Sequence, residues 1–95
     1  MSILVYLRLA VDQKDVPEFE RDLAQMDALA RAQPGFIWSE TLRSPDATAT
    51  YVILSEWEAR DHSRAWEHSP RHEEIMDKWG KRYAQAYKKR RFTSM

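Results

Sequence analysis

The chain has 95 residues, of which 43% are hydrophobic, and its 15 basic and 15 acidic residues give a formal net charge of zero. This length predicts one domain, near the lower limit for a self-sufficient core. The chain has no cysteine, which excludes disulfides, thiolate metal sites and thiol nucleophiles. No N-terminal apolar run is long enough for a signal peptide or a membrane span, so we expect a cytoplasmic protein without membrane contact.

The balanced total hides an uneven charge distribution. Residues 1–77 contain eight basic and all 15 acidic residues, whereas residues 78–95 contain seven basic residues and no acidic one. The run KKRR (88–91) resembles a nucleic-acid-binding pattern. A short basic run beside an acidic body is more typical of a solvated strand or of a contact between subunits, so we expect no nucleic-acid binding.

Residues 3–11, ILVYLRLAV, are rich in β-branched and apolar residues and predict a strand. Alternation gives this strand a core face and an opposite face: Ile3, Val5, Leu7 and Leu9 on the first, and Leu4, Tyr6 and Arg8 on the second. The next element is a helix that starts at DVPE (15–18), with Asp15 as cap, and ends at QPG (33–35). One apolar stripe runs along it: Val16, Phe19, Leu23, Met26 and Ala30.

Two alternating segments, 36–43 and 50–57, flank the turn sequence SPDAT (44–48) and predict a hairpin. In the first segment, alternation groups Phe36, Trp38, Glu40 and Leu42 against Ile37, Ser39, Thr41 and Arg43. In the second it groups Tyr51, Ile53, Ser55 and Trp57 against Val52, Leu54 and Glu56.

Two helices and a strand complete the predicted elements. Residues 58–69 are helical in composition, and Ser69-Pro70 restarts a helix with Ser69 as N-cap and Gly80 as the stop. Near-alternation in 84–93, which includes Tyr87, favours a last strand. The order β-α-β-β-α-α-β is typical of a ferredoxin-like α+β sandwich, a four-stranded antiparallel sheet with helices on one face. The chain also has four Trp, four Tyr and three Phe, so we expect a homodimer that covers the bare sheet face.

Two stretches, QPGFIWSETLR (33–43) and TYVILSEWEARDHSRAWEHSPRHEEI (50–75), resemble the antibiotic biosynthesis monooxygenase-like domain of the dimeric α+β barrel superfamily. The shared features are a Pro-Gly-Phe before the second strand, a Trp-Glu ending the third, an Ala-Trp in a short helix, and a Ser-Pro helix start followed by His. The likeness covers nearly the whole chain and is weakest after Gly80. It implies a homodimer with a pocket between sheet and helices in each subunit. The reaction does not follow, because one fold hosts several chemistries.

The haem-degrading branch of the superfamily can be compared residue by residue. Its short-helix Trp corresponds to Trp66, but its haem-ligating His falls on Ile75 or Met76, and its first-strand Asn falls on residues 7–8, Leu-Arg. His72 lies one helical turn before the ligand position, and Met76 would be a weak iron ligand. We therefore expect no cofactor, with haem as the alternative.

The cofactor-free oxygenase branch needs an apolar cavity with a few polar groups, because a deprotonated phenol supplies the electrons itself. The resemblance makes Trp57, Trp66 and His72 the candidate catalytic residues of a monooxygenase. The candidate residues for binding a small aromatic or quinol-like substrate are Tyr51, Arg8, Tyr6 and Met76.

Each candidate also has a purely structural interpretation. Trp57 and Trp66 could be ordinary core or interface aromatics, and His72 a solvent-facing residue of a first helical turn. His62 and His68 are predicted to lie on the surface, and no metal site is expected. The chain has no Asn, which favours the second class of function, a non-catalytic ligand-binding dimer. An open pocket lined by Trp57, Tyr51 and His72 would favour the oxygenase.

Overall fold

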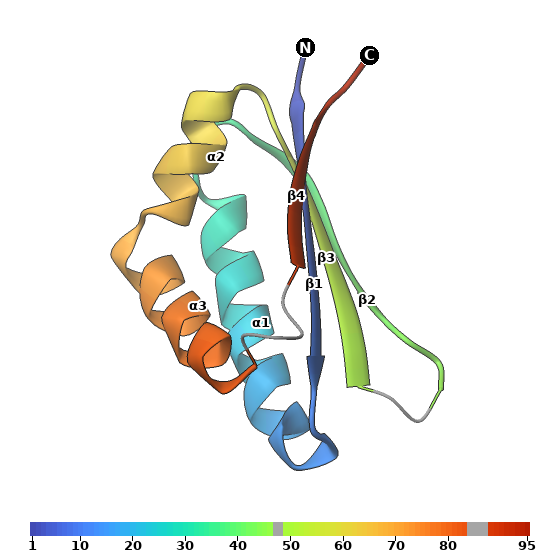
Figure 1. Ribbon diagram of the computed structural model, residues 1–95. Helices are drawn as coiled ribbons and strands as arrows, with labels where there is room; N and C mark the ends of the chain where they lie inside the picture. Colours follow the sequence, from blue (N-terminus) through green and yellow to red (C-terminus); the bar gives the residue numbers. More distant parts are fainter. Residues whose placement is uncertain (47–48, 84–87) are drawn as a thin grey trace.

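The computed structural model describes residues 1–46, 49–83 and 88–95. Its elements follow one another as β1 (Ile3–Val11), a 3-10 turn η1 (Gln13–Asp15), α1 (Val16–Arg31), β2 (Phe36–Arg43), β3 (Ala49–Trp57), α2 (Arg60–Glu67), α3 (Pro70–Arg82) and β4 (Lys88–Thr93). All three α-helices cover the same face of the sheet (Figure 1). The predicted ferredoxin-like α+β sandwich is confirmed.

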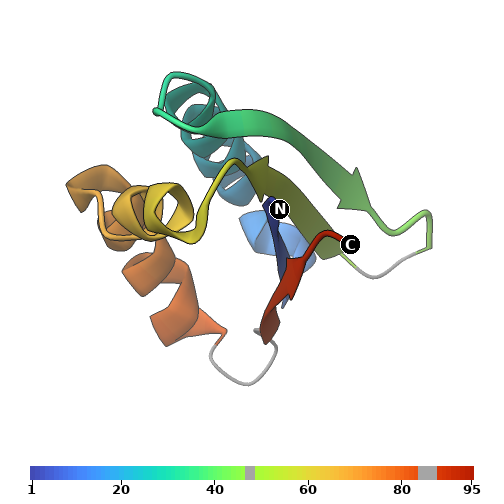
Figure 2. The same ribbon diagram turned by 90° about the horizontal axis from the view of Figure 1, so that it is seen from above.

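The four strands form one antiparallel sheet in the order β2-β3-β1-β4. Strand β1 lies between β3 and β4. Because β1 and β4 are antiparallel neighbours, the two chain ends lie at the same end of the sheet, as Figure 2 shows from above. Leu7 pairs with Ile53 on one side and with Lys89 on the other. Directly opposed residues share a face, so Lys89 joins Leu7 and Ile53 on the helix side of the sheet.

The core lies between this inner face of the sheet and the helices. The predicted inner residues of β1 and the α1 stripe contribute to it as expected, since Val5, Leu9, Phe19 and Leu23 are all buried. Phe19 makes edge-to-face contacts with Tyr51 and Trp79, at 4.9 Å between ring centroids in both cases. These contacts join α1, β3 and α3 into one core.

Polar contacts also join α1 to α3. The buried carboxylate of Asp22 accepts a hydrogen bond from the Trp79 indole at 2.9 Å and pairs with Lys78 at 2.6 Å. Burial would raise the pKa of Asp22, but the hydrogen bonds from Lys78 and Trp79 outweigh it and hold the pKa below its usual value. The carboxylate is therefore charged and fully partnered, as a buried charge must be.

The simple alternation predicted for β2 is wrong at its start. Phe36 pairs with Trp57, and Trp38, two residues later, pairs with Glu56, only one residue earlier on β3. The register between the two strands therefore shifts between Phe36 and Trp38. This irregularity separates Phe36 from Trp38: Phe36 packs on the inner core, with its ring 5.6 Å from that of Trp57, and Trp38 lies on the outer face. Ser39 thereby lies on the inner side, opposite Ser55.

The predicted helix stop at Gly80 is also wrong, because α3 continues to Arg82, with Tyr83 as its C-cap. The lysine and arginine after Gly80 are good helix formers, and one glycine costs a helix only about 1 kcal/mol. Ser69 occupies the N-cap position, but its hydroxyl donates to the Trp66 carbonyl and closes α2 instead. Asp15 makes no side-chain cap either; its carboxylate accepts a hydrogen bond from Tyr83.

The basic C-terminal segment folds back as β4. Of the predicted strand 84–93, the structure describes Lys88–Thr93; Tyr87 and the rest of 84–87 lie outside the described residues, as do residues 47–48 of the predicted turn. Lys89 and Arg91 contact Glu67 of the same chain. This part of the basic run therefore neutralises an acidic residue within the subunit.

The outer face of the sheet carries many apolar side chains and no helix covers it (Figure 1). Trp38, Leu42 and Phe92 are 37%, 44% and 53% exposed, and Leu54 of β3, between β2 and β1, is half-buried. Within the part of the chain that the structure describes, no helix has the length and apolarity needed to cross a membrane.

Candidate functional site

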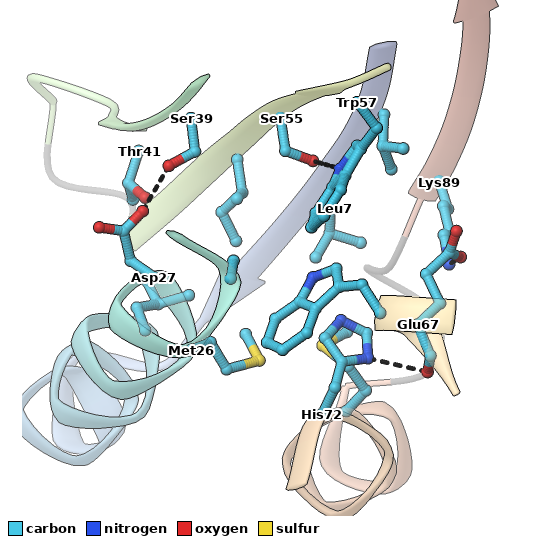
Figure 3. A pocket seen from close by; sticks show the side chains of 16 residues that line it. Leu7, Met26, Asp27, Ser39, Thr41, Ser55, Trp57, Glu67, His72 and Lys89 are labelled. Atoms are coloured by element: carbon cyan, nitrogen blue, oxygen red, sulfur yellow. Dashed lines mark hydrogen bonds and ion pairs between the residues drawn. The ribbon is translucent and has the colours of Figure 1, made fainter. Parts of the chain in front are cut away.

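A cavity of about 70 Å³ lies between the inner face of the sheet and helices α1, α2 and α3 (Figure 3). Its apolar lining consists of Val5, Leu7, Leu23, Met26, Ala30, Ile53, Trp57, Trp66 and Met76. Its polar lining consists of Asp27, Ser39, Thr41, Ser55, Glu67, His72 and Lys89. An apolar cavity with a few convergent polar groups is the usual form of a small-molecule site.

Aromatic rings build one wall of this cavity. Trp57, at the end of β3, stacks on Trp66 of α2 with 6.3 Å between ring centroids, and Trp66 meets His72 edge-on at 4.7 Å. The Trp57 indole donates to the Ser55 hydroxyl oxygen at 3.0 Å. The indole N–H is thus engaged, whereas the hydroxyl hydrogen of Ser55 can still be donated into the cavity.

His72 is positioned by the turn between α2 and α3. Its Nδ1 lies 3.1 Å from the backbone carbonyl oxygen of Glu67. A carbonyl only accepts, so Nδ1 carries the hydrogen and Nε2 is left with a free lone pair. Burial is the main cause that lowers the pKa of His72 to about 4. The ring is therefore neutral at pH 7, with Nε2 as its basic nitrogen.

The carboxylate of Glu67 extends to Lys89 of β4, away from the backbone carbonyl that contacts His72, and has an unusual environment (Figure 3). The side chain is only 9% exposed, and its Oε1 accepts from both Lys89 and Arg91 of β4. Its Oε2 is buried and has no hydrogen-bond partner among the described residues. Burial first, and the Arg91 charge second, lower the pKa of Lys89 to about 8.

A second polar group lies on the opposite side of the cavity, between α1 and β2. Asp27 accepts hydrogen bonds from Ser39 and, at 2.8 Å, from Arg31. Burial would raise the pKa of Asp27, but these two hydrogen bonds outweigh it and keep the pKa below its usual range. Asp27, Ser39 and Thr41 also line an open groove on the surface between α1 and β2, so the cavity and the groove meet at these residues.

The structure brings together four of the seven residues that the sequence predicted for the site. Trp57, Trp66, His72 and Met76 all line the cavity. Both tryptophans also belong to the hydrophobic core, so their structural interpretation is confirmed, and their catalytic role stays a prediction.

The other three candidates lie elsewhere. Tyr51 lines the surface groove between α1 and β2, and its hydroxyl donates to Glu20 at 2.7 Å. Tyr6 and Arg8 lie on the outer face of the sheet, opposite Arg90 and Lys88 of β4. These three side chains do not line the cavity.

The polar residues that complete the cavity were not among the predicted site residues. Ser55 could have been predicted, because it lies two residues before Trp57 and therefore on the same face of β3. Ser39 was hidden by the irregularity in β2, and Lys89 by the unknown register of β4. Glu67 follows Trp66 directly, but no sequence signal distinguishes it from the other acidic residues of that helix.

Neither of the other two histidines, His62 and His68, lines the cavity. No group of three or more possible metal ligands occurs within residues 1–46, 49–83 and 88–95. His68 is exposed as predicted, but the prediction of a surface position is wrong for His62, which is partly buried against Gly35 with its Nδ1 unpartnered. Of the two residues at the position of the haem ligand, Ile75 is buried in the core and has no donor atom for iron, whereas Met76 lines the cavity.

Fold and cavity together define a small α+β sandwich with an aromatic-walled cavity between its sheet and its helices. The profile of the antibiotic biosynthesis monooxygenase family matches residues 2–78. The chain therefore belongs to this family, and the resemblance seen in the sequence is confirmed. No curated protein matches the chain significantly.

Solved structures with the same fold extend over almost the whole chain. A variant of SnoaB, a cofactor-independent oxygenase from Streptomyces nogalater, has a TM-score of 0.83 and 24% identity, covering 98% of this chain and 92% of that one. Rv0793 from Mycobacterium tuberculosis has a TM-score of 0.88, 15% identity and coverages of 100% and 96%. A conserved protein from Methanosarcina mazei has a TM-score of 0.89, 15% identity and coverages of 100% and 94%. At these identities the comparison defines the fold alone.

Proposed function

We propose that the protein is a cofactor-independent oxygenase that oxidises a small phenol or hydroquinone in the cavity between sheet and helices. The observation that carries this is a neutral His72 with a free Nε2 beside the Trp57–Trp66 wall of an apolar cavity. The description of SnoaB as a cofactor-independent oxygenase supports the same class of reaction.

The reaction needs only the substrate, dioxygen and a base. His72 Nε2 takes the phenol proton, and the Ser55 hydroxyl donates to the resulting oxyanion. A ring carbon of the phenolate then forms a bond to dioxygen, and protonated His72 returns its proton to the peroxide. Cleavage of the O–O bond with loss of the ring hydrogen gives a quinone and one water, so phenol and dioxygen balance quinone and water.

The size of the cavity sets a limit on the substrate. About 70 Å³ is well below the roughly 300–1,000 Å³ of a pocket for a drug-sized ligand. Met26 and Met76 line the cavity, and their flexible side chains can rearrange more easily than the rings beside them. We therefore expect a substrate of one or two rings.

The test is oxygen uptake with a panel of one- and two-ring phenols and hydroquinones, in the presence of a chelator. His72→Gln should lower kcat by a factor of about 10² or more, whereas the exposed His68→Gln should not. Because the pKa of His72 is about 4, kcat/KM should stay level from pH 8 to about pH 5 and fall below it. Equal rates for His72→Gln and the unchanged protein would remove His72 as the base.

A haem titration followed by visible absorbance belongs to the same experiment. No spectral change is expected. A Soret shift followed by bleaching in air with a reductant would replace the cofactor-free reaction by haem degradation.

The outer face of the sheet supports a partner as well as a substrate. We infer that two copies pair through it, because its apolar residues would otherwise remain in water. The bare face thus supports a second copy of this chain as the protein partner.

A further inference from the structure

Lys89 differs from the other described lysines in its position. It projects from β4 to the inner face of the sheet and lines the cavity, where Glu67 of α2 meets it (Figure 3). Its side chain is 25% exposed. Its neighbour Lys88 pairs with Arg8 on the outer face and is exposed. The two lysines are thus adjacent in sequence and opposite in environment.

Burial and the neighbouring Arg91 cation favour the uncharged form of Lys89, whereas the Glu67 carboxylate that it contacts acts in the opposite direction. Glu67 Oε1 is shared by Lys89 and Arg91, so two cations compete for one buried carboxylate oxygen. His72, the other titratable group at this end of the cavity, is neutral. When Lys89 is uncharged, Glu67 and Arg91 balance each other; when it is charged, the partly buried cluster carries an excess positive charge. A lysine in a desolvated site next to another cation is the usual form of an activated amine.

We infer that Lys89 is a nucleophilic amine that captures small aldehydes in the cavity as an imine. This activity goes beyond the proposed oxygenation and does not depend on it. The apolar walls formed by Leu7, Trp66 and Met76 suit the carbon chain of such an aldehyde.

Glu67 can supply the proton transfers that this step requires. Its carboxylate takes a proton from the Lys89 ammonium, with which it is in contact. The free Nζ attacks the carbonyl carbon and forms a carbinolamine. Glu67 then returns the proton to the carbinolamine hydroxyl, which leaves as water and gives the protonated imine. One aldehyde is consumed and one water released, with no oxidant or reductant.

The test traps the imine by reduction. The full-length protein is incubated under nitrogen at pH 7 with propanal and cyanoborohydride, and peptide mass spectrometry locates the propyl group. Lys89 should be modified about ten times faster than Lys88 or more. Exposure alone predicts the opposite order, because Lys88 is the more accessible amine. The inference would be overturned if Lys89 were modified no faster than the exposed lysines Lys14, Lys81 and Lys88.

Two matched variants complete the experiment. Lys89→Met should abolish the rapid modification, and Lys88→Met should retain it, with thermal unfolding recorded for both. The mapping of the unchanged protein decides the outcome even if Lys89→Met does not fold. Because no phenol or dioxygen is present, failure here leaves the oxygenase test untouched, and failure of oxygen uptake leaves the imine test untouched.

Discussion

At the scale of the residue, His72 shows how surroundings set chemistry. The sequence offers three histidines in a charged stretch, and only this one has its ring at the cavity, edge-on to Trp66. Burial opposes its protonation, while the Glu67 carbonyl fixes the hydrogen on Nδ1. The same burial that keeps the ring unprotonated at pH 7 also makes its protonation costly for the fold.

This cost predicts a dependence of stability on pH. The unfolded chain protonates His72 near pH 6.5, whereas the folded chain does so only at about pH 4. Between these values the unfolded state binds more protons, so the stability present above pH 6.5 is lost as the pH falls toward 4. The total is about 3 kcal/mol. Urea unfolding at several pH values should show a smaller loss for His72→Gln than for the unchanged protein, with His68→Gln as control. An equal loss in His72→Gln would contradict the assignment.

Tyr51 provides a second prediction at this scale. Its hydroxyl donates a hydrogen bond to Glu20 in the surface groove between α1 and β2, and its side chain does not line the cavity. Tyr51→Phe should therefore reduce the free energy of unfolding by about 1 kcal/mol and leave the affinity for phenols unchanged. Calorimetric titration and urea unfolding measure the two quantities separately. A large loss of affinity would return Tyr51 to the substrate site that the sequence suggested.

At the scale of the element, the two glycines have opposite roles. Gly35 ends the connection into β2 with φ at 81°, and a Cβ there would lie 2.2 Å from Cγ of His62. Gly80 lies inside α3, and a Cβ there would meet no atom within 4 Å. The first glycine is required by backbone conformation and close packing, whereas the second only weakens a helix.

Alanine substitutions should separate these roles. Gly80→Ala should stabilise the protein by about 0.5–1 kcal/mol, because it lowers the entropy that the helix loses on folding. Gly35→Ala should destabilise it by more than about 1 kcal/mol, through strain at positive φ and the clash with His62. Chemical denaturation measures both. A destabilised Gly80→Ala would mean that this position needs glycine for contact with a partner.

At the scale of the whole molecule, the sheet has one face covered by helices and one face left bare. On the bare face, Leu54 of β3 lies at the centre of the sheet, opposite Tyr6 of β1 and Glu40 of β2. The large aromatic content of a 95-residue chain is divided among the buried core, the cavity wall and this surface.

Light scattering at micromolar concentration should give about twice the 11.3 kDa of one chain. Leu54→Lys, which places a charge at the centre of the bare face, should shift the protein toward the monomer. Lys81→Leu, on an exposed helix position, serves as the control. A mass near 11.3 kDa for the unchanged protein would exclude the homodimer.

The sequence by itself determined the order of the elements, the fold class, the family resemblance and four of the residues that line the cavity. The alternation in β1 and the apolar stripe of α1 are local patterns. The buried face of a strand follows from a period of two residues and that of a helix from a period of 3.6 residues. Trp57, Trp66 and His72 could be placed because they stand within or beside such elements.

Only the tertiary structure decided the rest. The irregularity in β2 moved Ser39 inward, and the pairing of β4 with β1 brought Lys89 to the cavity beside Glu67, 22 residues earlier in the chain. Alternation had already placed Tyr6 and Arg8 on the face of β1 away from the core, but only the structure showed that the cavity lies on the other face. A shift of one residue in strand pairing reverses the face of every side chain, and no local sequence pattern encodes the partner strand.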